Sequence, residues 1–279
     1  AYNVAIGDSA GVAVTTGTNN TLVGGLAGDA LTTGAENVAV GMQALSTEDA
    51  HGQNTAVGMQ ALRDLNAGAT GFNTAIGHIA GRVMTTGVSN TLIGASTGDA
   101  LTDADHNTAV GAGALTADTL GSKSTALGKN ALYTQNFTTA TDSFNVAVGH
   151  EAGLLITTGV NNTLIGAIAG DALTDGLKNV AVGQNALGAD TQGDNSVAIG
   201  SNALCTQNGT NGNVYNVAVG ANAGFAITTG TLNNLVGALA GDALTTGHSN
   251  VVMGHAALST EDTGRKNVAI GYSALNAQN

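Results

Sequence analysis

A short pattern of alternating apolar and small side chains recurs along the whole chain. It reads Asn, then Val or Thr, Ala or Leu, Val or Ile, and Gly, with an Ala three residues after the glycine and a Gly or Leu next. In the first copy, Val4 and Ile6 face one way and Ala5 faces the other. β-Branched residues at alternate positions favour a strand. The pattern therefore predicts a short β-strand that ends at a glycine.

The copies are evenly spaced. There are sixteen of them; twelve of the fifteen steps are 17 residues, and the others are 19, 21 and 20. Seventeen residues hold two short strands and two turns, but not the two helices of repeats of about 33 residues. Stacking at about 4.8 Å would pair each strand with its copy in the next unit. The spacing predicts an all-β, repetitive β-solenoid of about 16 coils. The copies begin at Asn3, Asn20, Asn37, Asn54, Asn73, Asn90, Asn107, Ser124, Asn145, Asn162, Asn179, Ser196, Asn216, Asn233, Asn250 and Asn267.

The motif glycine is the expected corner of each coil, because glycine permits positive φ and close backbone contact. The motif asparagines, among them Asn3, Asn20, Asn37, Asn54, Asn73 and Asn90, tolerate the left-handed conformation and are expected to stack as an amide ladder. The Gly-x-x-Ala-Leu step is either a strand or a single helical turn. The corner glycines are Gly7, Gly24, Gly41, Gly58, Gly77, Gly94, Gly111, Gly128, Gly149, Gly166, Gly183, Gly200, Gly220, Gly237, Gly254 and Gly271.

A second period of about 70 residues is superimposed on the first, because the three longer steps fall at every fourth copy. It divides one continuous repeat domain, taken as a segment of a longer chain, into blocks of four coils. An aromatic residue precedes the first motif of each block, and we expect these rings to pin the long connections onto the body. The rings are Tyr2, Phe72, Phe144 and Tyr215; the blocks are residues 1–71, 72–143, 144–214 and 215–279.

Composition narrows the possible partners. The net charge is −12, and the seven basic residues are scattered, so no basic stripe exists to bind nucleic acid. No apolar run approaches the roughly 18 residues of a membrane span. The alanine-rich coil is thin, while the Val, Ile and Leu residues suffice to line a further interface. We therefore expect lateral self-association as a parallel homotrimer, which closes without edges.

Candidate chemistry is sparse. Asp29, Asp99, Asp171 and Asp242 recur once per block and are expected to bond turn amides. Coils four apart are roughly 19 Å distant, so one chain cannot gather these carboxylates around an ion; three symmetry copies of an Asp or a His remain an alternative. No nucleophile–base–acid set is recognisable. The sequence predicts no enzyme, no cofactor and no metal site.

The motif resembles repeats of known surface fibres. Asn-Thr-Ala-Ile-Gly and, at residues 195–200, Asn-Ser-Val-Ala-Ile-Gly are similar to the head repeats of trimeric autotransporter adhesins. The longer form with Gly-x-x-Ala-Leu and Thr-Thr-Gly resembles repeats of bacteriophage tail-fibre proteins. The resemblance implies a left-handed β-roll, parallel homotrimers and an extracellular place on a virion or a bacterial cell surface. Adhesin head repeats are usually shorter than 17 residues, which puts the roll geometry in question.

Three functions follow in order of preference. The first is a structural rod or stalk segment of a trimeric fibre. The second is an adhesin head, in which Tyr133, Phe137, Phe144 and Tyr215 of the long connections bind a host glycan or protein. The third is ice binding on Thr-Thr pairs, which Ser46-Thr47 and similar residues replace in third and fourth coils. A four-bladed propeller is the alternative fold.

Overall fold

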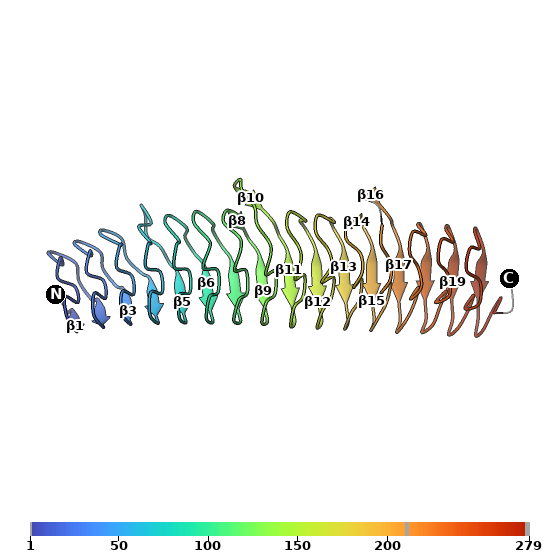
Figure 1. Cartoon of the computed structure of the whole chain (residues 1–279), viewed down its shortest axis with the longest axis horizontal. Helices are drawn as coiled ribbons and strands as arrows, with labels where there is room; N and C mark the ends of the chain where they lie inside the picture. The colour runs from blue at the N-terminus through green and yellow to red at the C-terminus, as the bar shows by residue number, and fades with distance from the viewer. Residues whose placement is uncertain (1, 210–211, 277–279) are drawn as a thin grey trace. The chain divides into compact units, whose positions relative to one another are not determined.

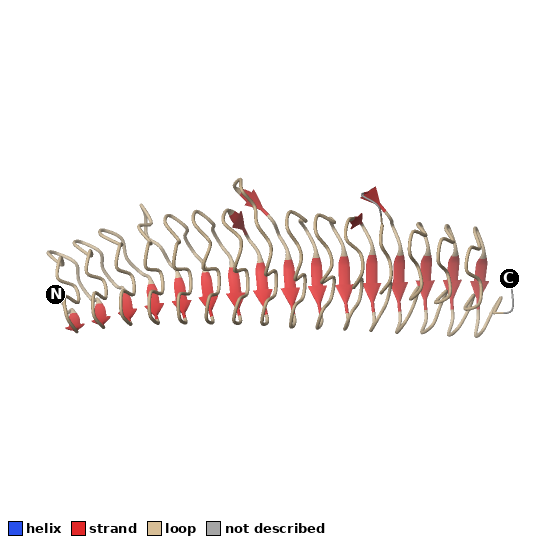
Figure 2. Ribbon diagram, in the orientation of Figure 1, coloured by secondary structure: helices blue, strands red, loops and turns tan. Residues whose placement is uncertain are grey.

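The computed structural model describes residues 2–209 and 212–276, and these form an all-β parallel solenoid without helices. The chain divides into two compact units, Ala1–Ser143 and Phe144–Asn279, each with eight coils. Their boundary coincides with the boundary between the second and third blocks. In each unit the main strand recurs at the same place in successive coils (Figures 1 and 2).

In unit 1 the main strands pair in parallel and in sequence order. Val4 lies opposite Thr21, and Thr55 lies opposite Thr74, so the longer connection between the last two leaves the register unchanged. The strands are β1 (Val4–Ile6), β2 (Thr21–Val23), β3 (Val38–Val40), β4 (Thr55–Val57), β5 (Thr74–Ile76), β6 (Thr91–Ile93), β7 (Thr108–Val110) and β9 (Thr125–Leu127).

Unit 2 repeats this arrangement. Val197 lies opposite Val217 across its long connection, of which residues 210–211 lie outside the described residues. The strands are β11 (Val146–Val148), β12 (Thr163–Ile165), β13 (Val180–Val182), β15 (Val197–Ile199), β17 (Val217–Val219), β18 (Asn234–Val236), β19 (Val251–Met253) and β20 (Val268–Ile270).

Each coil has one main strand, so the prediction of two strands per coil was wrong. Among the described residues, a second strand pair forms in two places: β8 (Gly121–Ser122) pairs with β10 (Thr141–Asp142), and β14 (Gly193–Asp194) pairs with β16 (Gly212–Asn213). The Gly-x-x-Ala-Leu step is neither strand nor helix but a run of turns. Parallel pairing of equivalent strands also excludes the propeller.

The core is filled by complementary side chains within each coil. The middle strand residue points inward and is buried in every coil from β2 onward, as Leu22 and Ala39 illustrate. Where the middle strand residue is leucine, the residue four positions after the motif glycine is glycine. Where the third or fourth coil of a block has alanine in the strand, that later position holds a leucine, such as Leu45. A Cβ on Gly28 would lie 2.8 Å from a methyl of Leu22. One large side chain therefore fills the same space from either side of the coil.

The corners are made by left-handed residues. All sixteen motif glycines have φ between +127° and +145°, a region that is essentially restricted to glycine. A Cβ on Gly7 would also lie 2.5 Å from the carbonyl oxygen of Gly24. At the other end of the strand, the residue before the motif asparagine is also left-handed, as Asn19 and Phe72 are. The motif asparagine itself does not take this conformation.

The motif asparagines between Asn20 and Asn250 are buried, and they bridge successive coils mainly through bonds to the backbone. The Oδ1 of Asn20 accepts the backbone N–H of Asn37 at 2.9 Å, and its Nδ2 donates to the Gly34 carbonyl at 2.8 Å. The expected amide-to-amide bond is present as well in several coils, where the Nδ2 of Asn90 donates to the Oδ1 of Asn73 at 3.2 Å and that of Asn250 to Asn233 at 3.0 Å. Further side-chain amide bonds join coils two residues after the motif glycine, where Gln60 donates to Gln43 and Asn185 donates to Asn202.

Candidate functional site

The outward face of the main strands carries an apolar column in each unit. The third residue of every main strand is Val, Ile, Leu or Met, and its side chain points away from the core. Ile76 is 38% exposed and Ile165 is 39% exposed. Parallel sheets are ordinarily covered on both faces. This sheet face is therefore an unpartnered apolar surface in the single chain.

The four aromatic residues that precede the blocks do not pin the long connections, and that prediction was wrong. Tyr2, Phe72, Phe144 and Tyr215 are all exposed, with Phe72 at 58% and Tyr215 at 49%. Phe72, Phe144 and Tyr215 occupy the left-handed position before the motif asparagine, which directs their rings outward.

The candidate host-binding residues fall into two groups. Tyr133, Phe144 and Tyr215 are exposed and accessible to a partner. Phe137 is only 5% exposed, and its backbone N–H donates to Asp118. Its ring anchors the connection from inside, so its assignment as a contact residue was wrong.

A buried carboxylate holds each long connection in place. Glu48, Asp118 and Asp190 occupy the same inward position in the third coil of their blocks, where the second coils have leucine, and all three are buried. Glu48 accepts the backbone N–H of Ala67, and Asp118 accepts that of Phe137. Each bond joins the third coil to the connection that leaves the fourth coil.

The second and third blocks add a glutamine to this clamp. Gln135 donates to Asp118 at 2.6 Å and to the hydroxyl of Ser124 at 2.9 Å. Gln207 donates to Asp190 and to Ser196 in the same way. Serine thus replaces the motif asparagine in the coils where a glutamine amide enters the core.

Burial raises the pKa of Asp118 and of Asp190 above the ordinary value of 3.8. Desolvation of the charged carboxylate is the largest cause, and the hydrogen bonds from Gln135 and Gln207 oppose it. These acids are enclosed by their own chain, which suits them to structure more than to chemistry on a ligand.

The prediction that the recurring aspartates bond turn amides is met only in part. The buried Oδ1 atoms of Asp29, Asp171 and Asp242 have no hydrogen-bond partner among the described residues, and Asp99 accepts from Thr116 at 2.6 Å. Burial also raises the pKa of Asp171 and of Asp242. Asp171 and Asp242 also accept a hydrogen bond from their own backbone N–H, which opposes the effect of burial.

One group of potential metal ligands occurs in the described part of the chain, namely Glu48, Asp49 and His51. Both oxygens of Glu48 are already engaged: Oε1 accepts from the His51 backbone and lies 3.1 Å from its Nδ1, and Oε2 accepts from Ala67. The group is therefore satisfied by hydrogen bonds. Cys205 is half-buried, and the Nδ2 of Asn185 lies 3.0 Å from its sulfur.

The threonine pairs form a column whose equivalents differ from those expected. Thr15 stacks on Thr32, and Thr32 stacks on Asp49 through backbone and hydroxyl bonds. Asp49, and not Ser46 or Thr47, thus replaces the threonine in the third coil. The threonine column is therefore interrupted in the first block, as the sequence already indicated, and a continuous array for ice binding is not present there.

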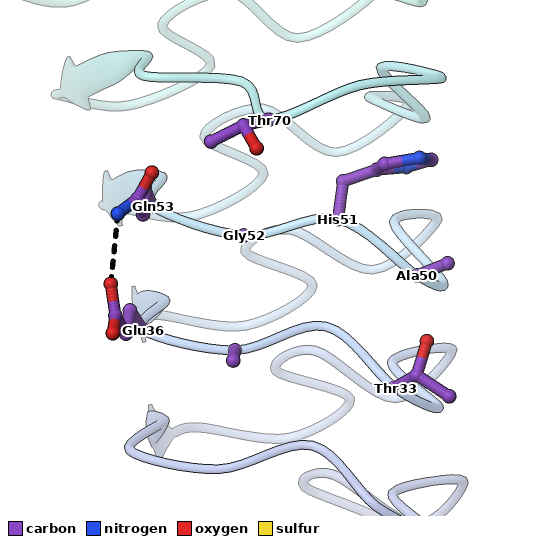
Figure 3. Close-up of a pocket in the computed structure, with 8 residues that line it drawn as sticks. Thr33, Glu36, Ala50, His51, Gly52, Gln53 and Thr70 are labelled. Atoms are coloured by element: carbon purple, nitrogen blue, oxygen red, sulfur yellow. Dashed lines mark hydrogen bonds between the residues drawn. The ribbon is translucent and has the colours of Figure 1, made fainter.

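A shallow polar hollow of about 330 Å³ lies beside the first long connection. Figure 3 shows Gln53 above Glu36 at one end, His51 and Thr33 toward the other, and Thr70 on the coil above. Gln53 Nε2 donates to Glu36 Oε2 at 2.9 Å. The sequence interpretation missed this hollow and the buried acids. For the acids a signal exists, because Glu48 stands where the neighbouring coils have Leu31 and Leu65.

Comparison of the chain with protein-family models, with curated proteins and with solved structures gives no match. Within residues 2–209 and 212–276 no helix has the length and apolarity that crossing a membrane requires.

Proposed function

We propose that the chain is a structural, self-associating segment of a trimeric fibre on a virion or a bacterial cell surface. The observation that carries this proposal is the apolar column on the outward strand face. Burying such side chains stabilises by roughly 25 cal/mol for each Å² removed from water. Three chains around an axis cover all three faces and leave no exposed sheet face.

The repeat itself favours a second and third copy of this chain as the partner. An outward apolar residue recurs once per coil, at the strand spacing of about 4.8 Å. A parallel copy has the same spacing, so every apolar residue meets an equivalent one along the whole surface. A partner of any other fold would match this spacing over a few coils only.

Light scattering of the intact chain after size exclusion tests this proposal. We expect the mass of three chains and an assembly that resists heating in SDS. A monomer at micromolar concentration would contradict the trimeric form of the proposal.

The exposed aromatic rings favour a second role, presentation of binding residues to a host. Phe144 and Tyr215 are about half exposed, and Tyr133 is 41% exposed. Large exposed rings are enriched in binding surfaces. Replacing Tyr133 and Tyr215 by alanine should then weaken cell binding without changing the oligomeric state, and unchanged binding would reject these residues.

A further inference from the structure

The hollow beside the first long connection exists because a strand pair is missing there. In the second block, Thr141 donates to the Leu120 carbonyl and Ser143 donates to the Ser122 carbonyl, which closes the surface with β8 and β10. In the first block, the shorter connection keeps only the equivalent of the second bond, from Gly71 to Gly52 at 3.1 Å. Among the described residues no donor reaches the Ala50 carbonyl.

Small residues deepen the hollow. Ala35, Ala50 and Gly52 form its floor, and a Cβ on Gly52 would lie 2.0 Å from the Ala35 carbonyl oxygen. The two backbones therefore touch beneath the opening. The polar side chains border this opening, with Glu36 and Gln53 at one end and His51 and Thr33 toward the other (Figure 3).

The rim offers a mixed set of donors and acceptors. The Glu36 carboxylate accepts, and the Gln53 amide keeps its Oε1 and one N–H for a ligand after donating to Glu36. The Nδ1 of His51 lies 3.1 Å from a Glu48 oxygen, which leaves the other ring nitrogen, Nε2, for a hydrogen bond with a ligand. The hydroxyls of Thr33 and Thr70 donate or accept.

These features select one ligand class. No lysine or arginine lines the hollow and the chain is acidic, which disfavours phosphates, sulfates and sialylated glycans. The volume is at the lower end of the roughly 300–1,000 Å³ of ligand sites, so it suits a single ring. We propose that this hollow binds one residue of a neutral saccharide, whose hydroxyls pair with Glu36, Gln53 and His51.

An aromatic platform lies on the same side of the molecule. Glu36, Gln53 and Phe72 precede the motif asparagine in successive coils, and neighbouring members of such a column are about 4.8 Å apart. The ring of Phe72 is 58% exposed, so its face is open to the apolar side of a sugar ring. The site thus combines the planar amide and the aromatic ring beside an ordered carboxylate.

An array of neutral and sialylated oligosaccharides, probed with the intact chain, tests the site. We expect binding to neutral glycans, and at least a tenfold loss of affinity for the best of them in Gln53→Ala and in Glu36→Gln. The matched control is Asn195→Ala, which removes an amide from the same column beside β14 and β16, where the surface is closed. The Asn195→Ala variant should bind the same glycan with the affinity of the unmodified chain.

Three results would overturn this inference: no neutral glycan binds, sialylated glycans bind better, or Gln53→Ala binds as well as the unmodified chain. Circular dichroism on each variant verifies the fold. The inference does not depend on self-association, because all lining residues come from one chain. A monomer that binds the glycan would reject the trimer alone, whereas a trimer that binds none would reject the site alone.

Discussion

At the scale of single residues, the coil is defined by the positions at which the backbone takes a left-handed conformation. The motif glycine serves both for its φ and for the carbonyl stacked against it, while the residue two positions later is also left-handed but tolerates Ser, Gln, Leu or Asn. The two positions therefore differ in what they require. The first needs the absence of a Cβ, and the second needs only a residue that accepts about 1–2 kcal/mol of strain.

Replacing Gly111 by alanine tests this difference. Its φ is +136°, and a Cβ would lie 2.4 Å from the Gly128 carbonyl oxygen. We expect the free energy of unfolding, measured with denaturant, to fall by at least about 2 kcal/mol. Gly113→Ala in the same coil is the control, because its φ is +68° and the nearest atom belongs to the movable Asn130 side chain. Equal losses at the two positions would contradict the account.

The buried acids give a pH dependence opposite to ordinary acid unfolding. The folded-state pKa of Asp118 and Asp190 is raised above 3.8, so folding binds protons between the two values. Their contribution to stability is fully present below about pH 3.8 and is lost as the pH rises through the raised folded pKa. The double variant Asp118→Asn, Asp190→Asn lacks this contribution.

Denaturant unfolding of both proteins at a series of pH values from 7 to 4 measures the effect. Relative to the double variant, the unmodified chain should gain stability as the pH falls. Because both proteins share all the other carboxylates, the difference between their pH profiles isolates the two acids. A difference that stays constant across the series would show that the two carboxylates keep their ordinary pKa.

The residue scale is also where sequence reasoning was least complete. The corner glycines could be located because they recur without exception. The exposure of Phe72 and the burial of Phe137 could not, since both are aromatics in long connections and differ only in the direction that the backbone gives them. The acid clamp was hidden because its partners are backbone N–H groups, which no sequence pattern displays.

At the scale of one coil, stability depends on complementary volumes. The second coil of a block pairs a strand leucine with a glycine across the core, as Leu92 with Gly98, and the third pairs Ala109 with Leu115. The alternation of strand residues predicted that the first and third side chains share one face and that the middle side chain lies on the other. It did not predict which of the two faces is inward. The structure chooses the face with alanine and leucine, because a three-residue strand and its tight corners leave little interior volume.

A double-mutant cycle measures this complementarity. Leu92→Ala should cost about 2–5 kcal/mol by opening a cavity. Gly98→Leu alone should also destabilise, because its Cβ would lie 2.8 Å from a methyl of Leu101 and 2.9 Å from one of Leu92. The double variant recreates the arrangement of the third coil, so it should lose less than the sum of the single losses. Additive losses in denaturant unfolding would reject complementary packing.

At the scale of the whole molecule, the same repeat that builds the interior also patterns the surface. The 17-residue spacing predicted the solenoid and its parallel register, because stacking equivalent residues is the simplest way to satisfy every strand. It could not reveal the hollow at Gln53, which depends on a connection that fails to form a strand pair. Departures from the repeat, more than the repeat itself, mark where a ligand can bind.

The outward column is the feature by which the whole molecule should associate, and two lysine substitutions in neighbouring coils can test it. Ile165 lies in the column and is 39% exposed, whereas Leu155 is 44% exposed in a turn away from the strand. Both side chains point outward, so neither Ile165→Lys nor Leu155→Lys should unfold the coil. Burying an unpaired charge is costly, so Ile165→Lys should lower the mass measured by light scattering to that of one chain, and Leu155→Lys should leave the trimer intact. If both variants remain trimeric, the chains associate through another surface and the outward strand face must have a different partner.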